Sequence, residues 1–509
     1  MLKTRTQKAA LNTATAALSE LVHLGCGLIL PRMILSYYGS SYNGITSSAK
    51  QFLSAVSILT VGVSGTTRFA LYRSLLNHDI KKTSGVIRAT EKYMRKVGIV
   101  LLIYVAILTV VYPLLKDTGY GWTEVAPLII AAGISASGRY FFGTTYMALL
   151  SADQSIYISN IFLIAANITN LLISTVLIRK NCSIQVVKLC SSFALLLSPF
   201  LRAVYVRKKY KLDRACEPDY SALSLRRDVM AHSIANIVHD HTDIIVLTIF
   251  CNVKIVSVYT IYNLVMNALK KTQQIFTSGT EAVFGNMWAK EEVEKIKQSL
   301  GCYEYIISAF VSIVFSATVV LLLPFISLYT KGVHDVEYIL PIYAIVITGA
   351  QMFYSFRTPY LTIVQGVGHY KQTKNGAYAE AIINIVTSVI LVKYIGIVGV
   401  AVGTLIANVF RTVQYALYID KHIVPRGKTV FARRILWTVS NILIIYFIVS
   451  SKASQFAYLD WKAWIVTALI ISILSILLTA LSSLIFYRKD FFSTILLVYR
   501  VIGKKRKNT

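Results

Sequence analysis

The chain has 509 residues, of which 55% are hydrophobic and only 15% are charged, and its formal net charge is +29 at pH 7. A soluble protein carries about a quarter charged residues, whereas the apolar residues here form long blocks such as 97–115 and 465–486. About 20 apolar residues cross a hydrocarbon core as a helix. The composition therefore excludes a string of soluble domains and predicts an all-α polytopic membrane protein.

The apolar blocks, and the polar or glycine-containing breaks between them, predict about fourteen membrane spans. We expect every span to be a helix, because irregular backbone exposed to lipid leaves peptide groups without hydrogen bonds. The first span is too long for a cleavable signal peptide, and no small-residue cleavage site follows it. In chain order, the expected spans cover 9–36, 44–67, 97–115, 125–150, 156–178, 184–201, 229–250, 255–281, 305–329, 338–365, 375–392, 397–419, 435–450 and 463–487.

The basic residues indicate which side of the membrane each loop faces. Lys and Arg concentrate in the N-terminus, in the loops that follow even-numbered spans, and in the tail 504–507. The positive-inside rule makes this side cytoplasmic, so we expect both termini in the cytoplasm. The charge then suits anionic lipid headgroups better than nucleic acid. The longest outer loops, 116–123 and 451–462, leave no room for an extracytoplasmic catalytic domain, so we do not expect an enzyme.

An internal repeat relates the first six spans to the next six. Because six is an even number, the two halves enter the membrane in the same direction, as parallel repeats around a central cavity. We therefore expect one six-helix bundle in 1–215, a second in 216–425, and two additional helices with a basic cytoplasmic tail in 426–509. The matching positions lie 217 or 218 residues apart: Tyr42 and Tyr259, Ile58 and Ile275, Gly62 and Gly279, Arg139 and Arg357, and Gln154 and Gln372.

Lysines in the eighth expected span are the main candidates for substrate binding. Lys270 and Lys271 lie near the middle of 255–281, where a charge costs roughly 2.5–3.5 kcal/mol on insertion scales and is expected to face a cavity. Lys270 shares a polar helix face with Asn263, Asn267, Gln274 and Ser278. The equivalent second span has a similar face, with Ser47, Lys50, Ser54 and Ser57. The candidate cations are Lys270, Lys271, Lys50, Arg139, Arg357 and Arg32.

Snorkelling or a structural ion pair is the alternative role for charges within spans. We favour this alternative for Arg411, Glu281 and Glu380, which lie near the expected inner interface, and leave it open for Arg32. Carboxylates and imidazoles at membrane depth are candidates for coupling to H⁺ or Na⁺. An equally favoured reading is that Asp240 and Asp243 neutralise Lys270 or Lys271. The candidate coupling residues are Asp240, Asp243, His239, Glu20 and His23.

No cofactor or metal site is expected. The six cysteines show no paired spacing, and His239 and His241 would point to different faces of a helix, which disfavours zinc. The glycine-containing run 396–403 lacks the strand context of a nucleotide-binding loop. It is typical of a small-residue face on which helices pack closely.

Two stretches resemble a known family. The first runs from Leu30-Pro-Arg-Met-Ile-Leu-Ser-Tyr-Tyr-Gly39 through Tyr42-Asn-Gly44, followed by Leu71-Tyr72 and Asn77-His-Asp79; the second comprises Arg357-Thr-Pro359, 366–374, Asn384 and 396–404. With the span count, they resemble bacterial polysaccharide repeat-unit (O-antigen, capsule or exopolysaccharide, Wzx-type) flippases of the multidrug/oligosaccharidyl-lipid/polysaccharide exporter superfamily. The resemblance implies two six-helix bundles around a cationic cavity, and alternation between inward-open and outward-open forms.

The function predicted is translocation of polyprenyl-diphosphate-linked oligosaccharide repeat units from the inner to the outer leaflet of a bacterial plasma membrane. The expected partners are the lipid-linked oligosaccharide, anionic membrane lipids, H⁺ or Na⁺ as a candidate coupling ion, and candidate polysaccharide-assembly proteins. One alternative is a cation-coupled multidrug exporter of the same superfamily, whose cavity should be apolar and acidic. Another is a membrane glycosyltransferase or polysaccharide polymerase, which would need a larger loop or domain with metal-binding carboxylates.

Overall fold

A computed structural model describes residues 5–115, 119–213, 215–221, 241–277, 280–449 and 456–496. These residues form helices and connecting loops, with no strand among them. They divide into two compact units, which are described separately: unit 1 comprises Met1–Thr260 with Gly332–Val336, and unit 2 comprises Ile261–Lys331 with Glu337–Thr509. The expected all-α membrane fold is confirmed. The bounds of the three domains expected from the sequence stay predictions.

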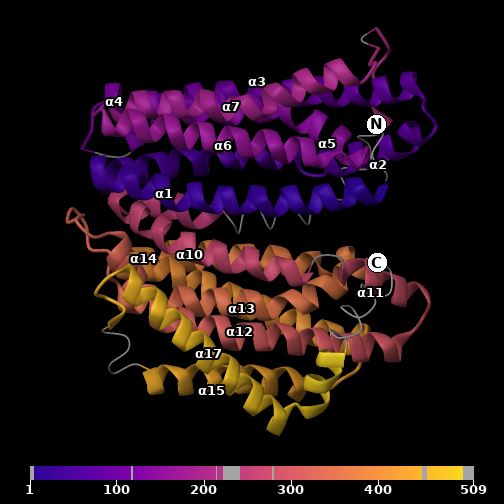
Figure 1. The fold of residues 1–509 in the computed structure, drawn as a ribbon, viewed down its shortest axis with the longest axis vertical. Helices are drawn as coiled ribbons and strands as arrows, with labels where there is room; N and C mark the ends of the chain where they lie inside the picture. Colours follow the sequence, from indigo (N-terminus) through magenta and orange to yellow (C-terminus); the bar gives the residue numbers. More distant parts are fainter. Residues whose placement is uncertain are drawn as a thin grey trace. The chain divides into compact units, whose positions relative to one another are not determined.

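Unit 1 is a bundle of long helices that run alongside one another (Figure 1). Its first helix bends at Gly39, whose φ of 81° lies in the left-handed region that favours glycine. This bend falls at the expected break between the first two spans. The helices of unit 1 are α1 (Arg5–Ser54), η1 (Ala55–Thr60), α2 (Val63–Leu76), α3 (Ile80–Leu115), α4 (Trp122–Gly138), the π-helix η2 (Arg139–Gly143), α5 (Thr144–Ala152), α6 (Ile156–Arg179), α7 (Ile184–Lys209) and His241–Phe250.

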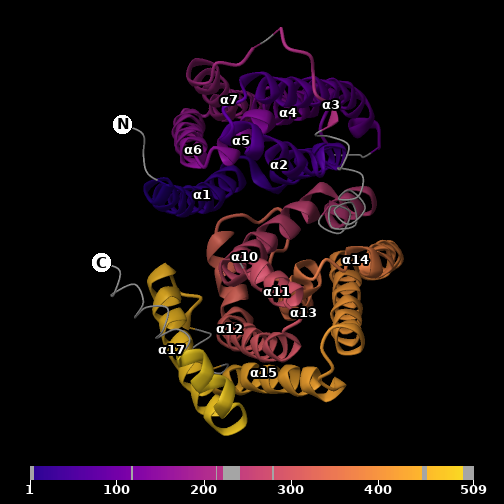
Figure 2. The same cartoon turned by 90° about the vertical axis from the view of Figure 1, so that its right-hand side faces the viewer.

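Unit 2 contains the helices from α10 onward, of which α10 also contributes its first residues to unit 1. Figure 2 shows α15 and α17 beside α12, and both helices pack against it. The helices of unit 2 are α10 (Val253–Thr277), α11 (Thr280–Ala289), α12 (Val293–Tyr329), α13 (Pro341–Gly366), α14 (Tyr370–His422), α15 (Lys428–Val449) and α17 (Trp461–Phe486).

Ten helical segments among the described residues are long and apolar enough to cross a membrane. The expected number of about fourteen is therefore not confirmed, and the difference has a physical origin. The first two expected spans join into the single bent helix α1, and most of the seventh, 229–250, lies outside the described residues. Helices α10 and α13 are long enough, at 25 and 26 residues, but polar side chains along them lower their hydropathy.

Helix breaks in the two units fall at or near glycines. Helix α2 begins at Val63, directly after Gly62. Helix α14 is interrupted at Ile395 and Gly396, between the eleventh and twelfth expected spans. Its two halves pack face to face through small residues.

The run 396–403 provides this close packing. A Cβ on Gly399 would lie 2.4 Å from the carbonyl carbon of Leu391, and one on Gly403 would lie 2.3 Å from Oγ of Ser388. Both distances are far shorter than a van der Waals contact, so glycine is needed where the halves of α14 meet. The small-residue face expected from the sequence is present.

A polar cluster in unit 1 ties the beginning of α1 to the loop between α5 and α6. Asp153 in this loop forms an ion pair with Lys8 at 3.3 Å and accepts hydrogen bonds from Tyr210 at 2.7 Å and from Ser155 at 2.8 Å. Partial burial raises the pKa of the Asp153 carboxyl, but these hydrogen bonds and the charge of Lys8 together lower that pKa below its ordinary value.

Candidate substrate site

A pocket of about 170 Å³ in unit 2 contains one of the lysines that the sequence singles out. Lys270 lies on α10, and Asn267 and Gln274 lie three residues before it and four after it, on the same face of the helix. Asn267 and Gln274 are exposed and Lys270 is half-buried, so other residues of the chain cover this polar face of α10 only in part. The pocket is lined by Lys270, Gln273, Gln274, Thr277, Glu281, Tyr354, Thr358, Leu361, Thr362 and Gln365.

The side chain of Gln273 fastens α10 to α13 beside this pocket. Its Nε2 donates to the backbone oxygen of Ser355 at 2.9 Å and to Oγ1 of Thr358 at 2.8 Å. Gln273 is buried, and a buried amide needs such partners because an unpaired polar group costs free energy. The contact fixes the register of α10 against α13 and thereby the position of Lys270.

Two cations approach the ring of Tyr354 on α13. Nζ of Lys270 lies 4.6 Å from the ring centroid, and Cζ of Arg357 lies 4.5 Å from it. Both distances are within the range of a cation–π interaction. Tyr354 therefore joins the pocket lysine to a buried arginine on the neighbouring helix turn.

Arg357 belongs to a buried charge cluster with Glu380 and Arg411, both on α14. Nη1 of Arg357 donates to Oε1 of Glu380, and Nε of Arg411 lies 3.4 Å from Oε2 of the same carboxylate. Arg357, Glu380 and Arg411 are 7%, 6% and 1% exposed. Buried charges require such pairing, because their desolvation costs several kcal/mol per ion. Snorkelling or a structural ion pair is the role that the sequence favours for Glu380 and Arg411, and the structure shows an ion pair between them.

Three hydrogen-bond acceptors surround the guanidinium group of Arg411. It donates to the backbone oxygen of Thr373 at 3.2 Å, to Gln414 at 2.5 Å and to the hydroxyl of Tyr415 at 2.5 Å. Gly376 makes room for it, since a Cβ there would lie 2.1 Å from Nη1 of Arg411. The cluster is thus rigidly built, and its two arginines share one carboxylate. With Lys270 and Glu281 included, the region carries one net positive charge.

Lys271, the residue after Lys270 on α10, is half-buried and is not among the residues that line the Lys270 pocket. Unit 1 holds the remaining candidate cations. Lys50 on α1 and Arg139 on η2 are exposed, and Arg32 on α1 is half-buried. A second lysine, Lys188 on α7, is half-buried and lies close enough for the charge of Lys50 to act on it. The sequence reasoning missed Lys188, although it lies within the sixth expected span and shares a helix face with Gln185, three residues before it, and Ser192, four residues after it.

The residues considered for ion coupling are spread over several environments. Asp243 is buried and accepts a hydrogen bond from Tyr259 at 3.1 Å, whereas Glu20 and His23 on α1 are exposed. His239 and Asp240 lie outside the described residues. Neighbouring His241 contacts Gln51 and lies 3.1 Å from Oγ of Ser54, so the helix His241–Phe250 packs through polar groups on α1.

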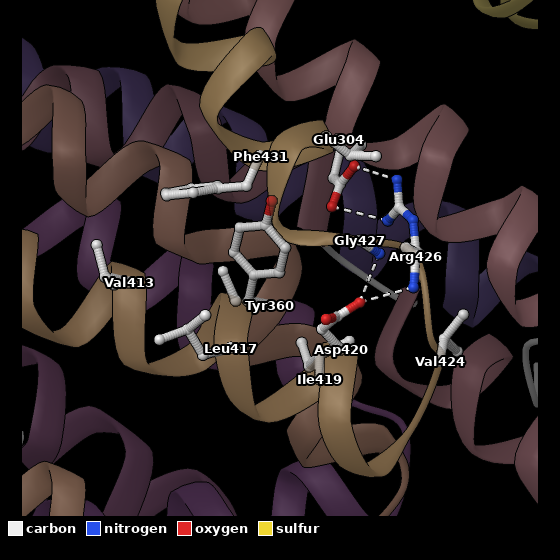
Figure 3. A pocket seen from close by; sticks show the side chains of 12 residues that line it. Glu304, Tyr360, Val413, Leu417, Ile419, Asp420, Val424, Arg426, Gly427 and Phe431 are labelled. Carbon is white, nitrogen blue, oxygen red and sulfur yellow. Dashed lines mark hydrogen bonds and ion pairs between the residues drawn. The ribbon is translucent and has the colours of Figure 1, made fainter.

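A second buried charge cluster in unit 2 is structural in character (Figure 3). Arg426 donates to both carboxylate oxygens of Glu304, at 2.8 and 2.7 Å, and Asp420 accepts from the backbone nitrogens of Arg426 and Gly427, both at 2.7 Å. Arg434 on α15 also lies 3.2 Å from Glu304. The adjoining cavity of about 50 Å³ is too small for a drug-sized ligand. The cluster joins α12, α14 and α15.

Comparison with known proteins gives matches in fold. No protein-family model matches the chain, and no curated protein sequence matches it. The lipid II flippase MurJ, in its inward closed conformation, matches with a TM-score of 0.71 and 14% identity, over 94% of this chain and 99% of that chain. An inward-facing multidrug resistance MATE family transporter of the MOP superfamily matches with a TM-score of 0.63 and 14% identity, over 86% and 98%.

A MATE transporter of Vibrio cholerae matches with a TM-score of 0.54 and 13% identity, over 82% of this chain and 98% of that chain. Identities this low show the fold alone. The chain therefore has the fold of the MurJ flippase and the MATE transporters, and the ten long apolar helices among its described residues indicate a multi-pass membrane protein. The fold does not test the narrower resemblance to polysaccharide repeat-unit flippases.

Proposed function

We propose that this protein is a flippase that moves a polyprenyl-diphosphate-linked oligosaccharide repeat unit from the inner to the outer leaflet of a bacterial plasma membrane by alternating access. The observation that carries the proposal is Lys270, a lysine on the polar face of an apolar helix, lining a pocket in a fold shared with a lipid-linked substrate flippase. A cation at this depth is the expected partner for a diphosphate.

The roles of the cations follow from their surroundings. Lys270, with Lys271 next to it on α10, binds the diphosphate. Arg357 is buried against Glu380, so it acts as a positioning residue that holds Tyr354 and thereby orients Lys270. The glycan occupies the hydrated part of the cavity, and the polyprenyl tail stays among the helices.

The fold similarities favour this reading over a multidrug exporter. MurJ matches 94% of this chain, whereas the two MATE transporters match 86% and 82% of it. All three proteins are themselves covered almost completely by the match, so the difference is in how much of this chain is accounted for. The similarity to the MATE transporters nonetheless supports cation-coupled drug export as the second candidate. Asp243 is buried and accepts a hydrogen bond from Tyr259. Among the candidate coupling residues that the structure describes, it is therefore our candidate for exchanging a coupling proton, in a flippase or in a drug exporter.

The test is a cell-based transport measurement on variants of the pocket. Lys270→Ala with Lys271→Ala should abolish the appearance of labelled repeat unit on the outer leaflet, at normal expression. Lys297→Ala, an exposed lysine on α12, is the matched control and should transport normally. Undiminished transport by the double variant would remove the assigned diphosphate site. Drug extrusion without any movement of repeat units would favour the exporter instead.

A further inference from the structure

A second polar pocket, of about 240 Å³, lies in unit 1 where α3 begins and α7 ends. Arg88 and Arg95 line it from α3, and Arg207 lines it from the last turn of α7. Arg88 and Arg95 are seven residues apart, so they lie on one face of α3. Tyr146 of α5 and Tyr210 also line the pocket, and the hydroxyl of Tyr210 donates to Asp153. Three guanidinium groups from two helices therefore converge on one cavity.

The guanidinium groups in this pocket keep donors available. Nη1 of Arg88 donates to the backbone oxygen of Cys216 at 2.6 Å, and Nε of Arg207 donates to the hydroxyl of Tyr146 at 3.2 Å. Each contact uses one of the five N–H groups that a guanidinium carries. Arg95 is exposed and makes no hydrogen bond or ion pair with any residue that the structure describes.

The acidic residues of the pocket do not neutralise it. Glu91 and Asp213 also line the cavity, so three arginines face two carboxylates and one positive charge remains. Among the described residues, no ion pair within 4 Å joins either carboxylate to the three arginines. A ligand that brings several acceptor oxygens would find three guanidinium groups among the residues that line the cavity.

General features of membrane proteins explain each arginine singly but not their convergence. Arg207 complements the dipole at the C-terminus of α7, and Arg88 and Arg95 follow the preference for positive charge on the cytoplasmic side. Neither effect requires three arginines and two tyrosines to line one cavity. We infer that this pocket binds a phosphate group, with Arg88, Arg95 and Arg207 as its ligands.

The depth and size of the pocket favour the phosphate of an anionic lipid headgroup. Arg95 is the ligand nearest the membrane, because it precedes the expected span 97–115 by two residues and so lies about 3 Å outside the hydrocarbon at 1.5 Å per residue. Arg207 and Arg88 lie six and nine residues beyond the expected spans, about 9 and 14 Å out, so the site reaches from the headgroup layer into the adjoining water. The headgroup layer is about 5–8 Å thick on each side of the core. The volume of about 240 Å³ lies below the range of about 300–1,000 Å³ for drug-sized ligands, and a small phosphate-bearing headgroup fits within it.

Binding of short-chain lipids to the purified full-length protein tests this site. Dioctanoyl phosphatidic acid is titrated and the bound complexes are counted by native mass spectrometry, with dioctanoyl phosphatidylcholine as the zwitterionic reference. Arg95→Gln should weaken phosphatidic acid binding about tenfold, because it removes a charged hydrogen-bonding group. Lys96→Gln, the matched control on the next residue of α3 and outside the pocket lining, should change it less than twofold.

Inorganic phosphate distinguishes the two sources of the ligand. If millimolar phosphate displaces the lipid, the site is a phosphate site filled by free phosphate; if it does not, the site belongs to a lipid headgroup. Equal weakening by Arg95→Gln and Lys96→Gln would overturn the inference, because it would mean that diffuse surface charge attracts the lipid. Absence of saturable binding to the wild-type protein would overturn it as well.

Discussion

Gly376→Ala tests the buried charge cluster of unit 2. An added Cβ would lie 2.1 Å from Nη1 of Arg411 and 2.4 Å from the amide of Gln414, where ordinary contacts begin near 3.4 Å. Arg411 is 1% exposed and therefore has no space into which to retreat. Its hydrogen bonds to Thr373 and Gln414 must lengthen, and each hydrogen bond to a charged group contributes about 1.5–3 kcal/mol.

The helix propensity of alanine opposes this loss by about 1 kcal/mol, so the free energy of unfolding should fall by about 1–3 kcal/mol, in the range usual for overpacking. Gly301→Ala is the matched control, because its Cβ would meet only a guanidinium nitrogen at 3.9 Å. Thermal unfolding in detergent should give a lower Tm for Gly376→Ala and an unchanged or higher Tm for Gly301→Ala. Equal melting of the two variants would refute the assigned packing around Arg411.

Three further predictions concern single carboxylates, each measured by thermal unfolding in detergent. Asp335 accepts from the backbone nitrogen of Ser40 at 2.8 Å, just after the bend of α1, so Asp335→Ala should cost about 1 kcal/mol, as loss of a helix cap does; an unchanged Tm would contradict this. The depressed pKa of Asp153 means that its contribution is complete above its unfolded pKa and is lost as the pH falls through its lower folded value. The Tm difference between wild type and Asp153→Asn should therefore shrink below about pH 4, and a constant difference would argue against the ion pair. Glu304→Gln should cost about 3–5 kcal/mol, because it leaves Arg426 as an uncompensated buried charge; a loss below 1 kcal/mol would show that the cluster is solvated.

Helix positions were predictable from the sequence where a span is uniformly apolar. The expected span 156–178 differs from α6 (Ile156–Arg179) by one residue. Helix α3 begins at Ile80, 17 residues before the expected span 97–115, because its first turns are rich in Lys and Arg and hydropathy does not detect them. The polar start of α3 is nonetheless helical, since its apolar face packs against other helices of unit 1, among them α2 and α5. Hydropathy therefore finds the membrane crossing but not the whole helix.

The candidate site was predictable only in part. The polar face of α10 follows from the spacing of its polar residues, so the sequence is sufficient to single out Lys270. The partner of Arg357 could not be assigned, because Glu380 lies on a different helix and only tertiary packing brings the two together. Local sequence carries no sign that Gly376 must be small, since that requirement comes from Arg411 on the other half of α14.

The most direct test of the proposed transport is a flipping assay with purified protein in liposomes. Polyprenyl-diphosphate-linked oligosaccharide is placed in both leaflets, and a glycan-modifying enzyme is added outside. Liposomes that contain the wild-type protein should render nearly all of the substrate accessible, whereas those with Lys270→Ala and Lys271→Ala should stop near the outer-leaflet half. Wild-type liposomes that also stop at half, with correctly folded protein, would contradict the proposed function.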